Sequence, residues 1–287
     1  MKYLIVNADD FGLTAGVNRA VIEGHTGGII TSATLMVNMP AFDEAAQLAR
    51  AHRTLGTGLH FNITQGRPVA PVSQVRSLVD ETGEFLGTTT ALAWRALAGR
   101  LRPAEVVVEL RAQLERALEA GLVLTHVDSH KHSHAIPLVC SAIIETIGDY
   151  GINAVRSPRE RWEVRQVGRP FESRRLITQA LGSFGIAQLC RISAARLEAA
   201  RVRTTDAFHG VTRTGFWTRP WLLDLIRSLP EGVSELMCHP GYQDPQLGAV
   251  KTRLRESRVT ELRLLTDPEV RALVRECPVQ LVDYSFS

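Results

Sequence analysis

Short apolar runs alternate with longer segments of helical periodicity along this chain of 287 residues, and that alternation limits the folds it can adopt. Strands that alternate with helices are typical of a parallel sheet, in which each helix returns the chain to the start of the next strand. The pattern therefore predicts an α/β fold. The predicted strands are Lys2–Asn7, Ile30–Val37, Thr57–Phe61, Leu122–Val127, Ile152–Val155, Val233–Cys238 and Val279–Val282; the predicted helices are Gly16–Glu23, Pro40–His52, Pro103–Ala120, Ala135–Asp149, Arg174–Ala200 with a break near Gly182–Gly185, Pro220–Ser228, Arg258–Leu264 and Pro268–Glu276.

Two stretches follow neither pattern. Residues 63–88 are rich in Gly, Pro, Ser and Thr, and they predict a loop whose length indicates a functional role. Residues 157–172 are irregular and charged. No linker, internal repeat or low-complexity tract divides the chain, so we expect a single domain over residues 1–287.

The composition suits a globular protein with a full core, since 45% of the residues are hydrophobic and 22% are charged. No apolar run reaches the ~18 residues typical of a transmembrane helix. Met1 and Lys2 lead directly into the first predicted strand, without the parts of an export signal, so we expect a cytoplasmic protein. The four cysteines are widely spaced and form no Cys-x-x-Cys pair, which argues against a disulfide framework or a zinc ribbon.

Arginines are concentrated between Arg156 and Arg203, although the net charge of the whole chain is only +3. A solvated surface with ion pairs is the favoured interpretation. The alternative is a lid or surface that binds an anionic or lipid-linked substrate, because apolar residues such as Leu176 and Phe184 lie in the same segment. Aromatic residues are not interleaved with the basic ones, so the pattern does not indicate nucleic-acid binding.

Two adjacent carboxylates, Asp9 and Asp10, follow the first apolar run and precede Gly12. A buried charge is costly unless it is paired or bound to a cation. One aspartate could cap a helix, but a cap does not need two. Adjacent residues of an extended chain point to opposite sides, so one carboxylate could bind a metal while the other stands beside it.

Histidines lie near the ends of three later strands. His60 is in the predicted strand Thr57–Phe61, His239 follows another strand, and the segment His126–His134 holds four histidines and one aspartate. Neutral imidazole is a common metal ligand, and its second nitrogen needs an orienting partner. Taken singly, each has an ordinary explanation. His60 could be a core histidine, His239 a histidine that begins a loop, and His126–His134 a surface loop. Taken with the two aspartates, they predict a divalent-metal site with a spare acid and base.

The candidate residues all lie near the end of a predicted strand. A closed barrel gathers the C-terminal ends of its strands around one mouth, whereas an open sheet spreads them along a crevice. This placement favours a (β/α) barrel over an open, doubly wound sheet. The residues concerned are Asp9, Asp10, His60, Asp128, His130, Arg156 and His239.

Four motifs together resemble the YdjC-like carbohydrate deacetylases, which include the chitooligosaccharide deacetylases. They are Asn7–Gly12, Gly58–Phe61, His126–His134 and Met237–Pro240, and they occur in the order found in that family. The stretch Ile30–Asn38 also resembles the second strand of the family. The resemblance covers almost the whole chain, and it is the combination of motifs that is specific.

The resemblance implies an irregular (β/α) barrel similar to that of polysaccharide deacetylases, and a hydrolase that removes the acetyl group from an N-acetylated amino sugar. It implies one divalent ion, Mg²⁺ or Zn²⁺, bound by Asp10, His60 and His130. Asp9 would be the general base and His239 the general acid.

A weaker set of residues would bind substrate or support the ligands, namely Asp128, His132, His134 and Arg156. We expect Arg156 to pair with Asp9 and Asp128 to orient His239 or His130. One subgroup of the family is associated with hopanoid lipid biosynthesis, and residues 149–160 are similar to it, so a glycolipid is the alternative substrate. The sequence leaves open a homodimer and the roles of His126, His132 and His134.

Two rival functions share part of this pattern. Two histidines and one carboxylate also bind iron in non-haem Fe(II) oxygenases, but those enzymes are usually all-β, unlike the alternation seen here. The second rival is a sugar- or metal-binding protein without turnover. The candidate acid and base argue against it.

Overall fold

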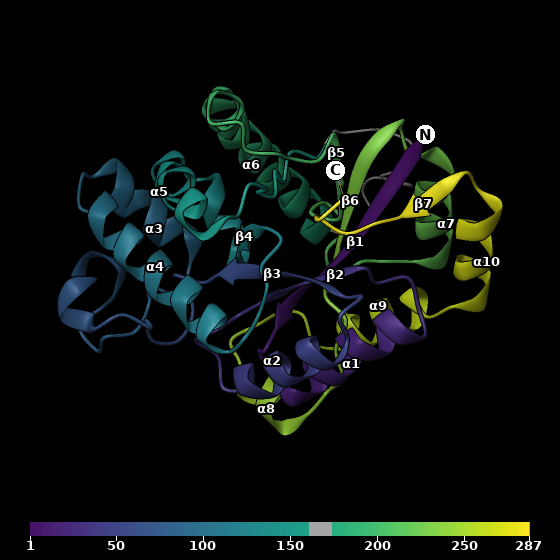
Figure 1. Ribbon diagram of the computed structural model, residues 1–287, viewed down its shortest axis with the longest axis horizontal. Coiled ribbons are helices and arrows are strands. Elements are labelled where there is room, and N and C mark those ends of the chain that lie inside the picture. Colours follow the sequence, from purple (N-terminus) through teal and green to yellow (C-terminus); the bar gives the residue numbers. More distant parts are fainter. Residues whose placement is uncertain (161–173, 287) are drawn as a thin grey trace.

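The computed structural model describes residues 1–160 and 174–286, and a parallel sheet lies at its centre (Figure 1). The strands are β1 (Lys2–Phe11), β2 (Ser32–Leu35), β3 (Gly56–Phe61), β4 (Val127–Ser129), β5 (Ala207–His209), β6 (Gly232–Cys238) and β7 (Val279–Leu281). Their order is β4-β3-β2-β1-β6-β5, and β7 pairs with the first residues of β1. Every pairing between these described strands is parallel, so the α/β prediction is confirmed.

The sheet curves into a half-barrel, and parallel contacts continue beyond its β4 edge. Val127 in β4 forms an isolated bridge with Val155, and Ala154 forms another with Arg203, shortly before β5 begins. These bridges carry backbone pairing from one edge of the sheet toward the other. The predicted barrel is thus confirmed in an irregular form, in which isolated contacts replace a continuous ladder.

Helices surround the half-barrel, with α3, α4 and α5 near the β4 edge and α7 and α10 near β7 (Figure 1). Their bounds are α1 (Ala15–Thr26), α2 (Phe42–Ala51), α3 (Thr89–Leu97), α4 (Pro103–Glu119), α5 (Pro137–Ile147), α6 (Arg174–Ala199), α7 (Arg219–Ser228), α8 (Pro245–Ala249), α9 (Glu256–Leu265) and α10 (Pro268–Glu276). Five begin with a side chain that accepts a hydrogen bond from a first-turn N–H, which satisfies a donor that the helix cannot. The capping residues are Thr14, Thr88, Thr218, Asp244 and Asp267.

Two elements continue past a point where the sequence predicts an end or a break. β1 continues to Phe11 instead of ending at Asn7, and α6 runs through Gly182–Gly185 without the predicted break. A glycine costs a helix only about 1 kcal/mol. The buried residues Ser183 and Ala187 lie on α6, which packs against α5, and this packing outweighs the glycines.

Three predicted strands are shorter than expected by several residues. Of Ile30–Val37 only Ser32–Leu35 forms β2. Of Leu122–Val127 only the last residue belongs to β4, and Thr125 instead donates a single backbone hydrogen bond to Thr57, at 2.8 Å. The predicted strand Ile152–Val155 holds only isolated bridges. The elements β5, α3 and α8 were not predicted, and β5 and α8 are too short for periodicity to reveal them.

Apolar residues fill the space between sheet and helices, whereas polar side chains line much of the half-barrel interior. Val6 and Leu236 belong to the main apolar cluster. Their neighbours Asn7 and Glu235 are fully buried as well, but they are polar. Because side chains alternate along a strand, β1 and β6 turn one face to the helices and the other to this polar interior.

Among the described residues, no helix combines the length and apolarity needed to cross a bilayer. Residues 161–173 lie outside the described residues, as does the side chain of Leu176. They include most of the irregular segment 157–172 and part of the arginine-rich segment. The interpretation of that segment as a solvated surface stays a prediction.

Candidate active site

A bulge in β1 places Asp9 and Asp10 inside the strand, not after it as the sequence suggested. The register with β2 shifts between Ala8 and Phe11, and Asp10 has a left-handed backbone with φ 68°. Gly12, with φ 95°, continues the irregular backbone. A bulge re-aims side chains that would otherwise alternate. Both carboxylates consequently face groups at the mouth, the end of the half-barrel where the strands end.

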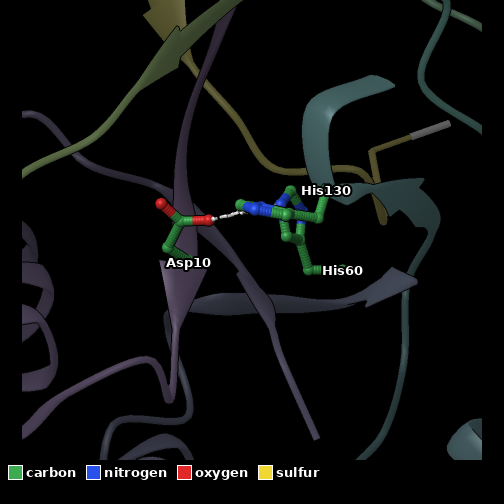
Figure 2. Close-up of side chains that lie close together, drawn as sticks. All are labelled: Asp10, His60 and His130. Carbon is green, nitrogen blue, oxygen red and sulfur yellow. Dashed lines mark hydrogen bonds and ion pairs between the residues drawn. The ribbon is translucent and has the colours of Figure 1, made fainter. Parts of the chain in front are cut away.

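Asp10, His60 and His130 meet at this mouth from β1, β3 and the residue after β4 (Figure 2). Asp10 Oδ1 lies 3.1 Å from His130 Nδ1 and 3.5 Å from His60 Nε2. The structure therefore brings together the three residues that the resemblance names as metal ligands.

The three donor atoms fit a divalent cation. Ligand atoms that share a cation at about 2.1 Å stand about 3.0–3.4 Å apart, close to the separations seen here. All three donors lie within 4.8 Å of one another. The other ring nitrogens are held as ligand histidines require, with His60 Nδ1 2.7 Å from Asp128 Oδ1 and His130 Nε2 3.2 Å from Gln65 Oε1.

Arg258, a buried residue of α9, pairs with the other oxygen of Asp10 and was not predicted as a site residue. Burial raises the pKa of Asp10, but Arg258 and the two histidines lower it more, so this pKa lies well below its usual value. Burial lowers the pKa of His60, but Asp128 and Asp10 raise it to about 10. Metal binding by His60 would therefore release a proton.

The guanidinium of Arg156 lies among three buried carboxylates. It donates to both oxygens of Asp9 at 2.7 Å, Nη1 lies 2.6 Å from Asp128, and Nε donates to Glu235 at 2.8 Å. The expected pairing with Asp9 is present. Asp9, His60 and Asp128 also cluster closely, but Arg156 already supplies the positive charge between the two aspartates.

The electrostatics of Asp9 follow from this contact. Burial raises the pKa of Asp9, but Arg156, His60 and His239 together outweigh burial, so this pKa lies well below its usual value and the carboxylate stays ionised. Burial raises the pKa of Glu235 to about 7, against the opposing effect of Arg156. Glu235 also accepts a hydrogen bond from the Tyr284 hydroxyl. A charged residue inside an apolar strand was the only sequence signal for Glu235, and Tyr284 had none.

His239 follows β6, which pairs directly with β1, so it lies beside Asp9. Its Nε2 is 3.9 Å from Asp9 Oδ2. Its backbone N–H donates to Glu261 at 2.6 Å, and its Nδ1 is 4.0 Å from the same carboxylate. Burial lowers the pKa of His239 to about 4, despite the nearby aspartates. The prediction that Asp128 orients His239 or His130 is wrong, because Asp128 contacts His60 and Arg156 instead.

The remaining histidines of the His126–His134 segment lie around this centre without joining the Asp10 group. The ring of His126 stacks on Tyr284 with centroids 3.7 Å apart, and a side chain at Gly58 would collide with it at 2.4 Å. His134 Nδ1 lies 2.5 Å from Ser129 Oγ.

His132 has a left-handed backbone with φ 54°, and its ring meets Phe208 edge-on at 6.2 Å. Its pKa falls to about 3 because of burial and of Arg156. Neither His132 nor His134 belongs to the Asp10–His60–His130 group.

The model of the family described as YdjC-like protein matches residues 3–276. The chain belongs to this family. A carbohydrate deacetylase of Geobacillus stearothermophilus is 37% identical over 286 residues, which cover 99% of this chain and 97% of the relative. A carbohydrate deacetylase of Mus musculus is 36% identical over 305 residues, covering 97% of this chain and 92% of the relative.

A solved structure from Enterococcus faecalis V583, provisionally described as a cellobiose-phosphate cleavage protein, is similar across the whole fold. It has a TM-score of 0.77 and 27% sequence identity, and the match covers 99% of this chain and 97% of that one. The resemblance to the YdjC-like family seen in the sequence motifs is thereby confirmed.

Proposed function

We propose that this protein is a hydrolase that removes the N-acetyl group from an acetylated amino sugar, a chitooligosaccharide or an N-acetylglucosaminyl conjugate, and releases acetate. The observation that carries the proposal is the convergence of Asp9 and His239 on the Asp10–His60–His130 group in one mouth. Full-length similarity to carbohydrate deacetylases supports the same substrate class.

Asp10, His60 and His130 would hold one divalent ion, Mg²⁺ or Zn²⁺. When bound, such an ion polarises an acetyl carbonyl and lowers the pKa of water. Two neighbouring residues would support these ligands. Arg258 keeps Asp10 ionised, and Asp128 fixes the orientation of the His60 ring. An amide is a weak electrophile, which explains why its hydrolysis needs such a pocket.

Asp9 and His239 supply the proton transfers. Asp9 is ionised and accepts the proton of the attacking water. His239 is neutral before the reaction because burial lowers its pKa to about 4; it lies 3.9 Å from Asp9, receives this proton from Asp9 and delivers it to the departing amine nitrogen. Because the two groups are neighbours, the proton needs to move only a short distance between them. Each transfer is typically worth ~10²–10⁴-fold in rate.

Acetate release from a substrate panel tests this function. The purified protein is incubated with Mg²⁺ or Zn²⁺ and with N-acetylglucosamine, diacetylchitobiose or an N-acetylglucosaminyl lipid, and acetate and free amine are both quantified. Equal amounts of the two products support the proposal, and the preferred member of the panel gives the substrate length or lipid conjugation. Sugar binding without either product would identify the non-catalytic rival instead.

Substitution of His239 tests the role of the acid. His239→Ala is expected to lose ~10²–10⁴-fold in kcat on an alkyl amide but far less on an acetanilide with an electron-withdrawing ring, whose amine needs little protonation to leave. His52→Ala is a control, since that histidine lies at the end of α2 and is not part of the site. An equal loss on both substrates would show that His239 positions the substrate and that the acid lies elsewhere.

A further inference from the structure

A chain of buried contacts leads from the C-terminal segment to Asp9. The Tyr284 hydroxyl donates to Glu235 Oε2. Glu235 Oε1 accepts from Arg156 Nε at 2.8 Å and lies 2.7 Å from Nη2. Arg156 Nη1 and Nη2 in turn donate to the two oxygens of Asp9, each at 2.7 Å. All four side chains are buried, with exposures of 4% or less.

Resting on the proposed role of Asp9, we propose that Tyr284 and Glu235 are positioning residues that fix the guanidinium of Arg156 and thereby the orientation of the Asp9 carboxylate. In the part of the chain that the structure describes, Tyr284 contacts Glu235 and His126, Glu235 contacts Tyr284 and Arg156, and neither belongs to the Asp10–His60–His130 group. They act only through Arg156.

The geometry of the guanidinium explains why an anchor is needed. Its planar fork presents donors on two edges, and here one edge faces Asp9 while the Nε edge faces Glu235. Asp128 also competes for Nη1, at 2.6 Å. With Glu235 on the far edge, Arg156 has one arrangement that satisfies all of its partners. Without that anchor, it could rotate toward Asp128 and release one oxygen of Asp9.

The C-terminal segment is built to hold Tyr284 in this place. Arg203 donates to the backbone carbonyls of Tyr284 at 3.0 Å and Phe286 at 2.7 Å. Val282 donates its backbone N–H to Leu4 at 3.0 Å. These contacts fix the end of the chain beneath the half-barrel interior and direct the tyrosine ring inward.

Packing alone does not account for a tyrosine and a glutamate here. The ring of Tyr284 stacks on His126, and phenylalanine would fill the same volume. The hydroxyl has Glu235 as its partner, and burial raises the pKa of Tyr284, so it remains a donor. A buried carboxylate costs stability unless its partners repay that cost. The pair therefore serves the orientation of Arg156.

A double-mutant cycle on the metal-loaded enzyme tests the proposal. Tyr284→Phe and Glu235→Gln should each lower kcat by about tenfold, the size of one hydrogen bond to a charged group, while KM and the affinity for the divalent ion stay unchanged. Because both act through Arg156, Tyr284→Phe should lower kcat less than twofold further in the Glu235→Gln background. Tyr150→Phe is the matched control, since it also removes a tyrosine–glutamate hydrogen bond, at 3.0 Å, but on the surface.

Two results would overturn the proposal: unchanged kcat in both single variants, or fully additive losses in the double variant. A lower melting temperature with normal kcat at 25 °C would show a structural role only. A crystal structure of Tyr284→Phe gives a readout independent of turnover, in which the paired contact between Arg156 and Asp9 should be loosened. If the wild type releases no acetate, the proposed function fails, and this structure still decides whether Tyr284 positions Arg156.

Discussion

Buried carboxylates in two regions of this molecule have pKa values that are shifted in opposite directions. At the mouth of the half-barrel, Asp9 and Asp10 each face a buried arginine, and the pKa of each lies below its usual value. Away from the mouth, Glu109 and Glu160 accept hydrogen bonds from amides and hydroxyls among the described residues, and burial raises the pKa of each. Burial is similar in both regions, but the arginines beside Asp9 and Asp10 help to outweigh it, whereas the neutral donors around Glu109 and Glu160 do not.

The two glutamates hold loops in place. Glu109 on α4 accepts from the backbone N–H groups of Val69 and Ala70 at 2.9 and 3.0 Å, and thereby fixes part of the long loop at 63–88. Glu160 accepts in the same way from Gly210 and Thr212 at 2.9 and 2.6 Å. Neutral donors suffice for such clamps, because backbone N–H groups hydrogen-bond to a carboxyl oxygen without any charge of their own.

The two aspartates need a permanent charge. A metal ligand and a proton acceptor must both be ionised at the pH of the reaction, and a buried carboxylate keeps its charge only beside a cation. The chain therefore places Arg258 beside Asp10 and Arg156 beside Asp9. A buried arginine helps to keep Asp9 and Asp10 charged, but it does not by itself keep a carboxylate ionised, since the pKa of Glu235, which also contacts Arg156, is raised to about 7.

Removal of the charge on Asp10 should have the largest effect. Asp10→Asn keeps the shape of the side chain but is expected to lose most divalent-ion affinity and at least ~10³-fold in acetate release, since several kcal/mol of catalysis depend on the ion. Calorimetric titration with Mg²⁺ and Zn²⁺ measures the affinity, and circular dichroism checks the fold. Full affinity together with full activity would remove Asp10 from the ligand set.

Asp9→Asn should have a smaller but still large effect. The amide cannot accept a proton, so we expect kcat to fall by at least ~10²-fold, while the affinity for the divalent ion is retained. Measurement of both quantities on one preparation separates Asp9 from Asp10. Near-normal turnover would reduce Asp9 to a structural partner of Arg156, and the comparison between the two regions would then hold only for Asp10.

The sequence revealed the parts of the site that lie on strands. Asp9, Asp10 and His60 stand in short motifs within apolar runs, where a polar residue is conspicuous. Arg258 could not be found in this way, since on α9 it looks like one more charged residue of an exposed helix face. Its burial depends on how α9 packs against the mouth, which is a tertiary property.

The fold was predictable to a similar depth. Strand–helix alternation indicated the parallel sheet, because apolar strand runs and helical periodicity are both visible in short stretches of sequence. The bulge at Asp10 could not be predicted, since its left-handed backbone depends on the neighbouring strand. The three-residue strand Ala207–His209 is too short to show any periodicity.

The smallest effect concerns the neutral clamp and tests the other side of the comparison. Glu109→Gln turns its new amide N–H₂ toward a backbone donor, which should cost about 1–3 kcal/mol of unfolding free energy.

The size of this cost should depend on pH. Burial raises the pKa of Glu109 above 4.5 in the folded protein, so the carboxyl group of the wild type binds its proton more tightly in the folded than in the unfolded state. The contribution of this protonation to the free energy of unfolding is complete below pH 4.5, and it is lost as pH rises through the pKa of the folded state. The stability difference between wild type and variant, measured by urea unfolding, should therefore be larger at acidic than at neutral pH. Glu119→Gln, at an exposed position on the same helix, controls for the removal of a charge. A difference that grows toward neutral pH would mean that Glu109 is held as an anion, like Asp9 and Asp10, without any arginine beside it.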